Sequence, residues 1–337
     1  MVAQSLKMQN VEAIVINVPG SLLKPGLTRK DAFLKTWQNS SPEVPVEFLQ
    51  NVCTCAEVVE TPTLLSLAKL HDTFIPPPLR KLILGAPASA VLSEAGKTQA
   101  DKKIEFIIDK EWVRLVSILK ALDFNLRDSE NQLQQLAIGE DLELTKYLLD
   151  CVRTKITRTA CTESHLRVYE KLHKSDKYLG LLLEDDLCIL PGFWKQVKEI
   201  FEWLEENRPD WDIVQLGYSK HAERPIKPIE GAPVSLAPLG AYGNTAVLIN
   251  NDNIAAYKVF LRIKKHRELA LKEGNKLLAN DVVIAEYPQL NRYVANVRLI
   301  GPPPGNHISV LAGKEMNYDS CCWDPEQLKL LTELYSE

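Results

Sequence analysis

One apolar stretch of strand length ends directly in three carboxylates. Residues 178–183 read YLGLLL, and Glu184, Asp185 and Asp186 follow without an intervening residue. A short, continuous apolar run is typical of a strand that is buried on both faces, as in a parallel sheet. Adjacent carboxylates repel one another, and the carboxyl ends of such strands are where α/β folds bind ligands. The sequence therefore predicts a cation-binding or ligand-binding site at the end of this strand.

The order of the three carboxylates favours a hard divalent cation. In an extended chain Glu184 and Asp186 point to one side and Asp185 points to the other. Mg²⁺ and Mn²⁺ prefer carboxylate oxygens and often share them with substrate phosphates. We therefore interpret Glu184 and Asp186 as ligands of Mn²⁺ or Mg²⁺. A solvated acidic turn before Pro191 is the alternative interpretation of the same residues.

Predicted strands and helices alternate along most of the chain. Apolar runs predict strands at 11–18, 102–108, 178–183, 212–216 and 246–249. Helical periodicity predicts helices at 28–38, 111–122, 140–154, 162–173, 193–206, 252–261 and 324–337. This alternation favours an α/β fold with a mixed, mainly parallel sheet flanked by helices.

The domain organisation is less regular in the first half of the chain. Residues 40–100 are rich in proline and show no regular topology. We therefore expect a single domain over 11–314 that carries a helical or irregular insertion at about 40–150. Residues 315–337 are expected to form a helical tail.

Composition excludes several classes of protein. The chain has 337 residues, 45% of them hydrophobic, and its 40 basic and 44 acidic residues give a net charge of −4. It is therefore neither a disordered polymer nor a basic nucleic-acid binder. The first residues lack the pattern of a signal peptide, and no apolar run reaches the ~18 residues of a transmembrane segment. We expect a cytoplasmic protein whose seven cysteines are reduced.

Several segments, in the same order along the chain, resemble glycosyltransferase family 25. That family includes the lipooligosaccharide glycosyltransferases and the collagen galactosyltransferases. The matching segments are Ile16-Asn17 with Arg29, Ala160 to His165, Leu183 to Asp186, Trp211 to Gly217, Ala241 to Ile249, and Asn280-Asp281. Two features depart from the family: residues 40–150 do not match it, and Thr159-Ala160 replaces the usual glycine before the cysteine.

The resemblance implies a GT-A (Rossmann-like) fold, a UDP- or GDP-sugar donor and a Mn²⁺ or Mg²⁺ ion. It implies a donor site made by Ile16, Asn17, Arg29, Ser164, His165 and Asp185. His307 would be a third metal ligand beside Glu184 and Asp186, whereas a lone loop histidine is more often a surface residue. Asp281 would be the general base for the acceptor hydroxyl in an inverting displacement. A helix N-cap is the alternative interpretation of Asp281.

The expected activity is metal-dependent transfer of a sugar from the nucleotide-sugar to a hydroxyl of a glycan or glycoprotein. Two alternatives stay open: a glycosyltransferase-like binding or scaffold protein without catalysis, and a metal-dependent hydrolase of sugar nucleotides. The joint presence of Glu184, Asp186, Asp281 and His307 favours an enzyme, because a degenerate relative would be expected to lose at least one of them.

Overall fold

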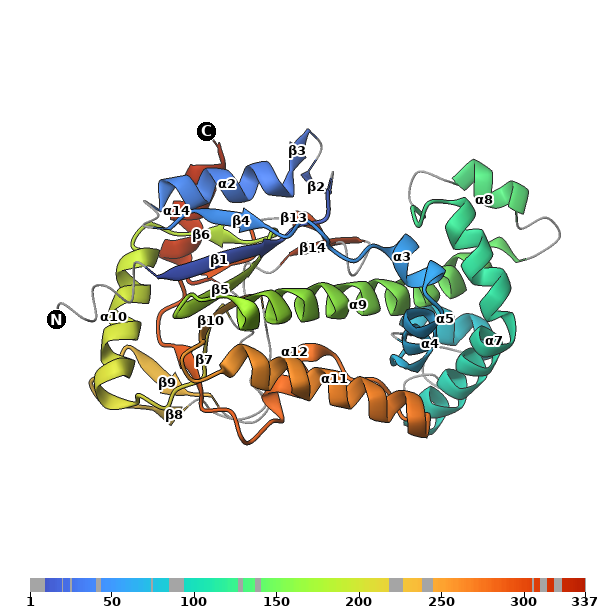
Figure 1. Ribbon diagram of the computed structural model, residues 1–337. Helices are drawn as coiled ribbons and strands as arrows, with labels where there is room; N and C mark the ends of the chain where they lie inside the picture. Colours follow the sequence, from blue (N-terminus) through green and yellow to red (C-terminus); the bar gives the residue numbers. More distant parts are fainter. Residues whose placement is uncertain are drawn as a thin grey trace.

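A central sheet with helices on both faces, joined to a helical lobe, makes up the computed structural model of the protein (Figure 1). The structure describes residues 10–19, 21–24, 26–40, 44–73, 75–84, 94–126, 130–136, 141–217, 227–237, 245–304, 306–309, 314–317 and 323–336. Within these residues, no helix combines the length and the apolar character that crossing a bilayer requires.

Within the described residues the central sheet has eight strands of mixed direction. In chain order they are β1 (Val11–Ile16), β4 (Val46–Phe48), β5 (Leu179–Glu184), β7 (Ile213–Gly217), β8 (Lys227–Pro228), β9 (Val234–Leu236), β10 (Ala246–Asn250) and β11 (Arg292–Ala295). Their order across the sheet is β4-β1-β5-β10-β7-β11-β9-β8. β4, β1, β5, β7 and β11 run in one direction, and β10 lies antiparallel between β5 and β7. The predicted α/β class is confirmed.

Three short two-stranded sheets accompany the large one. They pair β2 (Leu22–Lys24) with β3 (Leu27–Thr28), β6 (Cys188–Ile189) with β12 (Ile300–Gly301), and β13 (Asn306–Ser309) with β14 (Lys314–Asn317). The first of these is a hairpin between β1 and α2. β13 lies beside β2, so the last strands of the chain return to the segment that follows β1.

Helices cover the two faces of the sheet because strand side chains alternate between them. Leu181 and Leu183 of β5 pack toward α2 (Arg29–Asn39) and α10 (Phe193–Asn207). Leu182 packs on the other face, toward α9 (Leu142–Lys174), α11 (Ala255–Glu273) and α12 (Asn280–Ala285). The continuous apolar run of β5 is thus the signature of a strand covered on both sides.

Most of the segment 40–150, predicted as an insertion, forms a helical lobe with its own apolar core, whereas β4 at its start is an edge strand of the sheet. The lobe contains α3 (Cys55–Glu60), α4 (Pro62–Leu70), α5 (Pro77–Leu84), α7 (Glu94–Ala121), α8 (Glu130–Leu136) and the first half of α9. With 33 residues, α9 is about 50 Å long. It joins the lobe to the sheet, because its second half packs under β1 and β5 (Figure 1).

Three predictions of secondary structure are wrong in this region and beyond it. The predicted strand at 102–108 belongs to α7, where Ile104 and Ile108 lie one helical turn apart and are both buried. The two helices predicted at 140–154 and 162–173 are the single helix α9. The helix predicted to end at residue 261 continues to Glu273. Short apolar runs with β-branched residues do not by themselves distinguish a strand from a buried helical stripe.

The end of the chain packs back on the domain. α14 (Pro325–Ser336) confirms the predicted amphipathic helix, and Leu331 joins Trp323 in a small core with Cys188 and Leu190. Trp323 also donates its indole N–H to the carbonyl of Pro302 at 2.7 Å. Part of the expected helical tail is instead the strand β14.

A buried histidine in the lobe predicts acid sensitivity. His71 is 2% exposed at the end of α4, and burial, aided by Arg158 and Lys155, lowers its pKa to about 3. The folded protein keeps His71 neutral, whereas the unfolded chain protonates it below pH 6.5. The free energy of unfolding should therefore fall by roughly 2 to 3 kcal/mol between pH 6.5 and pH 4.5 through this residue.

Urea unfolding at several pH values measures this effect. The free energy of unfolding should fall less between pH 6.5 and pH 4.5 in His71→Gln than in the unmodified protein. His173→Gln is the control, because His173 is exposed. An unchanged slope in His71→Gln would show that other groups cause the acid sensitivity.

Candidate functional site

A cleft of about 580 Å³ lies where β1 and β5 end, between the sheet and the helical lobe. Its lining comes from the ends of β1 and β5, the start of α2, the segment that leads into α3, the corner after α7, and one face of α9. This volume lies within the usual range of small-molecule sites. Ile16, Arg29, Ser164 and His165 all line the cleft, together with the three carboxylates from Glu184 to Asp186.

Asp185 is buried and ties three segments together. Asn17 donates its amide to Asp185 Oδ2 at 2.5 Å, and the backbone N–H of Val18 donates to the same oxygen at 3.3 Å. Arg29 donates to Oδ1 at 3.3 Å. Burial and the neighbouring Asp186 raise the pKa of Asp185 to about 6, against the opposing effects of Arg29 and Asn17. Because both of its oxygens are engaged, Asp185 acts as an anchor between β5, the end of β1 and α2.

Arg29 bridges two of the three carboxylates. Its Nη1 lies 3.3 Å from Asp185 and 3.2 Å from Asp186 Oδ2, and the residue is 4% exposed. Burial lowers the pKa of Arg29, but Asp186 and Asp185 together outweigh burial and raise it. Thr28, the N-cap of α2, accepts the backbone N–H of Asp31 and so fixes the start of the helix that carries Arg29. Arg29 is therefore a fixed positive charge under the acidic strand end.

Glu184 lies against the buried imidazole of His165. Nε2 of His165 is 3.2 Å from Glu184 Oε1, without the alignment of a hydrogen bond, and Nδ1 lies 2.9 Å from the carbonyl of Cys161. Burial lowers the pKa of His165, but Cys161 and Glu184 outweigh burial and raise it well above its usual value. An imidazolium beside Glu184 is the state that these contacts favour.

Two sets of donor atoms in the cleft suit a metal ion. Glu184 and Asp186 are about a quarter exposed, whereas Asp185 is buried. Asp185 and Asp186 lie in a turn and not in the extended chain that the predicted alternation assumes, and Arg29 contacts both of them. The carboxylate oxygens of Glu184 and Asp186 fit the predicted Mn²⁺ or Mg²⁺. The ligand atoms of Cys161, His165 and Glu184 also lie within 4.8 Å of one another. That second set, with sulfur and nitrogen donors, suits zinc better than manganese.

One face of α9 forms a long wall of the cleft. Arg153, Thr157, Cys161, Ser164 and His165 recur at helical spacing along this face and all line the cleft. Ser164 Oγ accepts the backbone N–H of Cys53 at 3.0 Å and donates to the carbonyl of Ala160 at 2.9 Å. Ser164 thereby fixes the segment before α3 against the helix.

Sequence reasoning missed the part of the cleft that the lobe supplies. Asp123 and Phe124, at the corner after α7, line it, as does Arg153 on α9. These residues fall in or next to the segment with no family pattern. The helical periodicity from Arg153 to His165 is a usable signal, but only once 142–174 is treated as one helix.

Asp281 is not among the residues that line the cleft. It is the second residue of α12, whose start contacts α9 through the Asn280 amide and the carbonyl of Thr162, 3.4 Å apart. The alternative interpretation of Asp281 as an N-cap is wrong, because Ala279 holds that position. The backbone of His307 lies in β13 and pairs with Met316, but its side chain lies outside the described residues.

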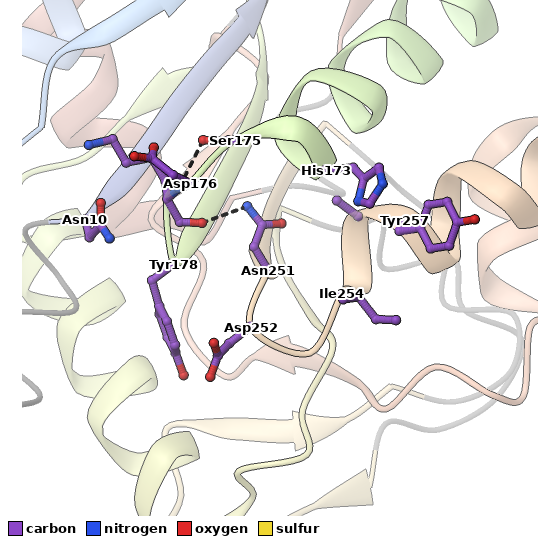
Figure 2. Close-up of a pocket in the computed structure, with 11 residues that line it drawn as sticks. Asn10, His173, Ser175, Asp176, Tyr178, Asn251, Asp252, Ile254 and Tyr257 are labelled. Carbon is purple, nitrogen blue, oxygen red and sulfur yellow. Dashed lines mark hydrogen bonds between the residues drawn. The ribbon is translucent and has the colours of Figure 1, made fainter.

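A second pocket, of about 280 Å³, lies at the opposite end of β5 (Figure 2). Asn251 spans it and donates to the carbonyls of Leu172 and Lys177, both at 3.2 Å. Its amide thus joins the turn between α9 and β5 to the segment after β10. His173 and Tyr257 stack at its edge with ring centroids 4.3 Å apart. This pocket lies at the amino end of β5, away from Glu184, Asp185 and Asp186.

Comparison with protein-family models and with curated proteins gave no match for this chain.

Proposed function

We propose that the protein is a glycosyltransferase that moves a sugar from a UDP- or GDP-sugar to a hydroxyl of a glycan or glycoprotein. One observation carries the proposal. Residues that the family resemblance drew from separate parts of the sequence, among them Arg29, His165 and Asp186, meet in one cleft at the carboxyl end of a buried strand. A GT-A type of fold is part of the proposal, and the mixed, mainly parallel sheet is compatible with it.

The carboxylates suit the demands of the reaction. The diphosphate of a sugar nucleotide is a poor leaving group until its negative charge is neutralised. Glu184 and Asp186 would hold the Mn²⁺ or Mg²⁺ ion that supplies this Lewis-acid chemistry. Arg29 orients Asp186 through the contact at 3.2 Å, and Asp185 holds Arg29 in place.

The acceptor hydroxyl must lose a proton as the new bond forms. Asp281 is proposed as the base that accepts it, with inversion at the sugar carbon. The family resemblance alone supports this role, because Asp281 does not line the cleft; its helix α12 contacts α9 at Thr162, about one turn from His165. His307 stays a proposed third ligand of the cation.

Thermal unfolding with nucleotides tests the proposal. UDP or GDP with Mn²⁺ should raise the melting temperature by several degrees, because binding at 100 times Kd stabilises by about 2.7 kcal/mol. Chelation of the metal by EDTA should remove most of the shift. A melting curve insensitive to all nucleotides with Mn²⁺ would contradict the proposal and favour the scaffold alternative. Comparing free sugar with transferred sugar distinguishes a hydrolase from a transferase.

A further inference from the structure

The cleft is elongated, and its two ends differ in chemistry. α9 lines it from His165 back to Arg153, and twelve residues of helix span about 18 Å. The acidic carboxylates lie at the His165 end. The Arg153 end is formed by residues of the lobe, notably Asp123 and Phe124. A diphosphate bound at the carboxylates leaves this other end for a second ligand.

The corner that carries Asp123 and Phe124 has an unusual backbone. The N–H of Phe124 donates to the carbonyl of Leu119 at 2.8 Å, and the N–H of Asp123 donates to that of Lys120 at 3.1 Å. This pair of bonds closes a helix with a residue in the left-handed region, where glycine is the usual choice. Asp123 has φ 48° and Phe124 has φ 58°. Two successive side-chain-bearing residues in that region are unfavourable, and a phenylalanine there is rare.

Helix termination alone does not explain these two residues. A glycine at position 123 would close α7 with less strain. Backbone strain of this kind is concentrated at ligand sites, where the side chain it presents is used. Both side chains line the cleft, and the Phe124 ring is only partly buried against the apolar core of the lobe.

The chemistry of this end suits a saccharide. A pyranose presents a face of C–H groups that packs on an aromatic ring, and a rim of hydroxyls that donate to carboxylates. Phe124 supplies the ring and Asp123 supplies the carboxylate. Arg153 donates to Asp150 Oδ1 at 3.0 Å and is 7% exposed, so its side chain is held in place where it lines the cleft.

We propose that this end of the cleft is a saccharide subsite in which a sugar ring stacks on Phe124 and hydrogen-bonds to Asp123. Its use as the acceptor subsite rests on the proposed glycosyl transfer. Because the lobe has no counterpart in the family resemblance, the subsite would give this chain its own acceptor preference.

Saturation-transfer NMR with methyl glycosides of galactose, glucose and mannose at millimolar concentration tests the proposal, with and without UDP and Mn²⁺. At least one glycoside should bind the unmodified protein, and Phe124→Ala should weaken that binding by about tenfold or more. Phe106→Ala is the matched control, because Phe106 lies on the exposed face of α7 and is 68% exposed. Absence of binding to the unmodified protein, or equal binding by Phe124→Ala, would overturn the subsite.

Asp123→Gly separates a binding role from a structural one. The substitution removes left-handed strain, so the melting temperature should rise, while glycoside binding should weaken severalfold. A higher melting temperature with unchanged glycoside affinity would overturn the role of Asp123. Glycoside binding at Phe124 without any nucleotide-dependent stabilisation would support the subsite and contradict glycosyl transfer. The two failures are therefore distinguishable.

Discussion

Asp186→Asn is expected to lower the rate of sugar transfer by about 10³-fold or more while leaving the protein folded. The amide has the size of the carboxylate and still accepts from Arg29, which lies 3.2 Å from Asp186. The negative charge is lost, and in the proposed reaction the cation that would offset the charge of the leaving diphosphate would be lost with it. That electrostatic contribution is worth several kcal/mol, and each 1.36 kcal/mol is about tenfold in rate. Initial rates of transfer from UDP- and GDP-sugars with Mn²⁺ measure the effect.

Asp176→Asn is the matched control for this substitution. Asp176 is an exposed aspartate before the other end of the same strand, in the second pocket (Figure 2). It should leave both transfer and nucleotide-dependent stabilisation unchanged. Because Asp186 is a quarter exposed, urea unfolding of Asp186→Asn should differ from the unmodified protein by less than about 1 kcal/mol. Undiminished transfer by a folded Asp186→Asn would contradict the role of this carboxylate.

The end of β5 could be predicted because its signal is local. An apolar run followed by carboxylates is visible in the nine residues 178–186. The structure has a strand where the apolar run predicts it and a turn at Asp185 and Asp186. β1, β7 and β10 are also buried on both faces and were predicted for the same reason. The continuous apolar run of each of these strands is enough to indicate a strand that is buried on both faces.

The helical lobe could not be predicted from local pattern. The run from Lys102 to Ile108 contains enough β-branched residues to indicate a strand, but it belongs to the helix α7, which packs against α9. α9 itself was divided because the threonines and arginines in its middle lower the helical signal. In the structure the hydroxyls of Thr157 and Thr159 donate hydrogen bonds to the backbone carbonyls four residues earlier, and the helix continues through both residues.

Several of the predicted site residues lie together at the cleft, whereas Asp281 does not line it and the contacts among the residues were not predicted. Asn17, Arg29 and Asp185 were each assigned to the donor, and all three are at the cleft or beside it. Their contacts join residues more than 150 positions apart, which no spacing rule reveals. Those contacts show that Asp185 is held from both of its oxygens by the protein itself. Which of the three carboxylates is held by the protein and which are partly exposed therefore depends on tertiary structure.

Arg29→Met is expected to destabilise the protein by about 1 to 3 kcal/mol near neutral pH. Methionine keeps much of the apolar stem but removes the guanidinium, which leaves Asp185 5% exposed and without its cation. Breaking a buried ion pair on one side costs about 3 to 5 kcal/mol when the remaining charge stays buried. The loss is smaller here because the pKa of Asp185 is about 6 even beside Arg29, so without Arg29 the carboxyl takes up a proton. Arg29→Lys should cost less, since it keeps a charge but contacts fewer oxygens. Urea unfolding near neutral pH measures the free energy of unfolding of the unmodified protein, Arg29→Met and Arg29→Lys.

A pair of double variants identifies the charge that causes the loss. Adding Asp185→Asn to Arg29→Met removes the buried charge and keeps an acceptor for Asn17, so it should restore more than half of the lost stability. Adding Asp186→Asn instead should restore little, because Asp186 is a quarter exposed and water already solvates it. That result would show that the role of Arg29 at the acidic strand end is to pair with the buried Asp185. If Asp185→Asn and Asp186→Asn restored the same amount of stability, the loss in Arg29→Met would instead be due to general repulsion among the carboxylates.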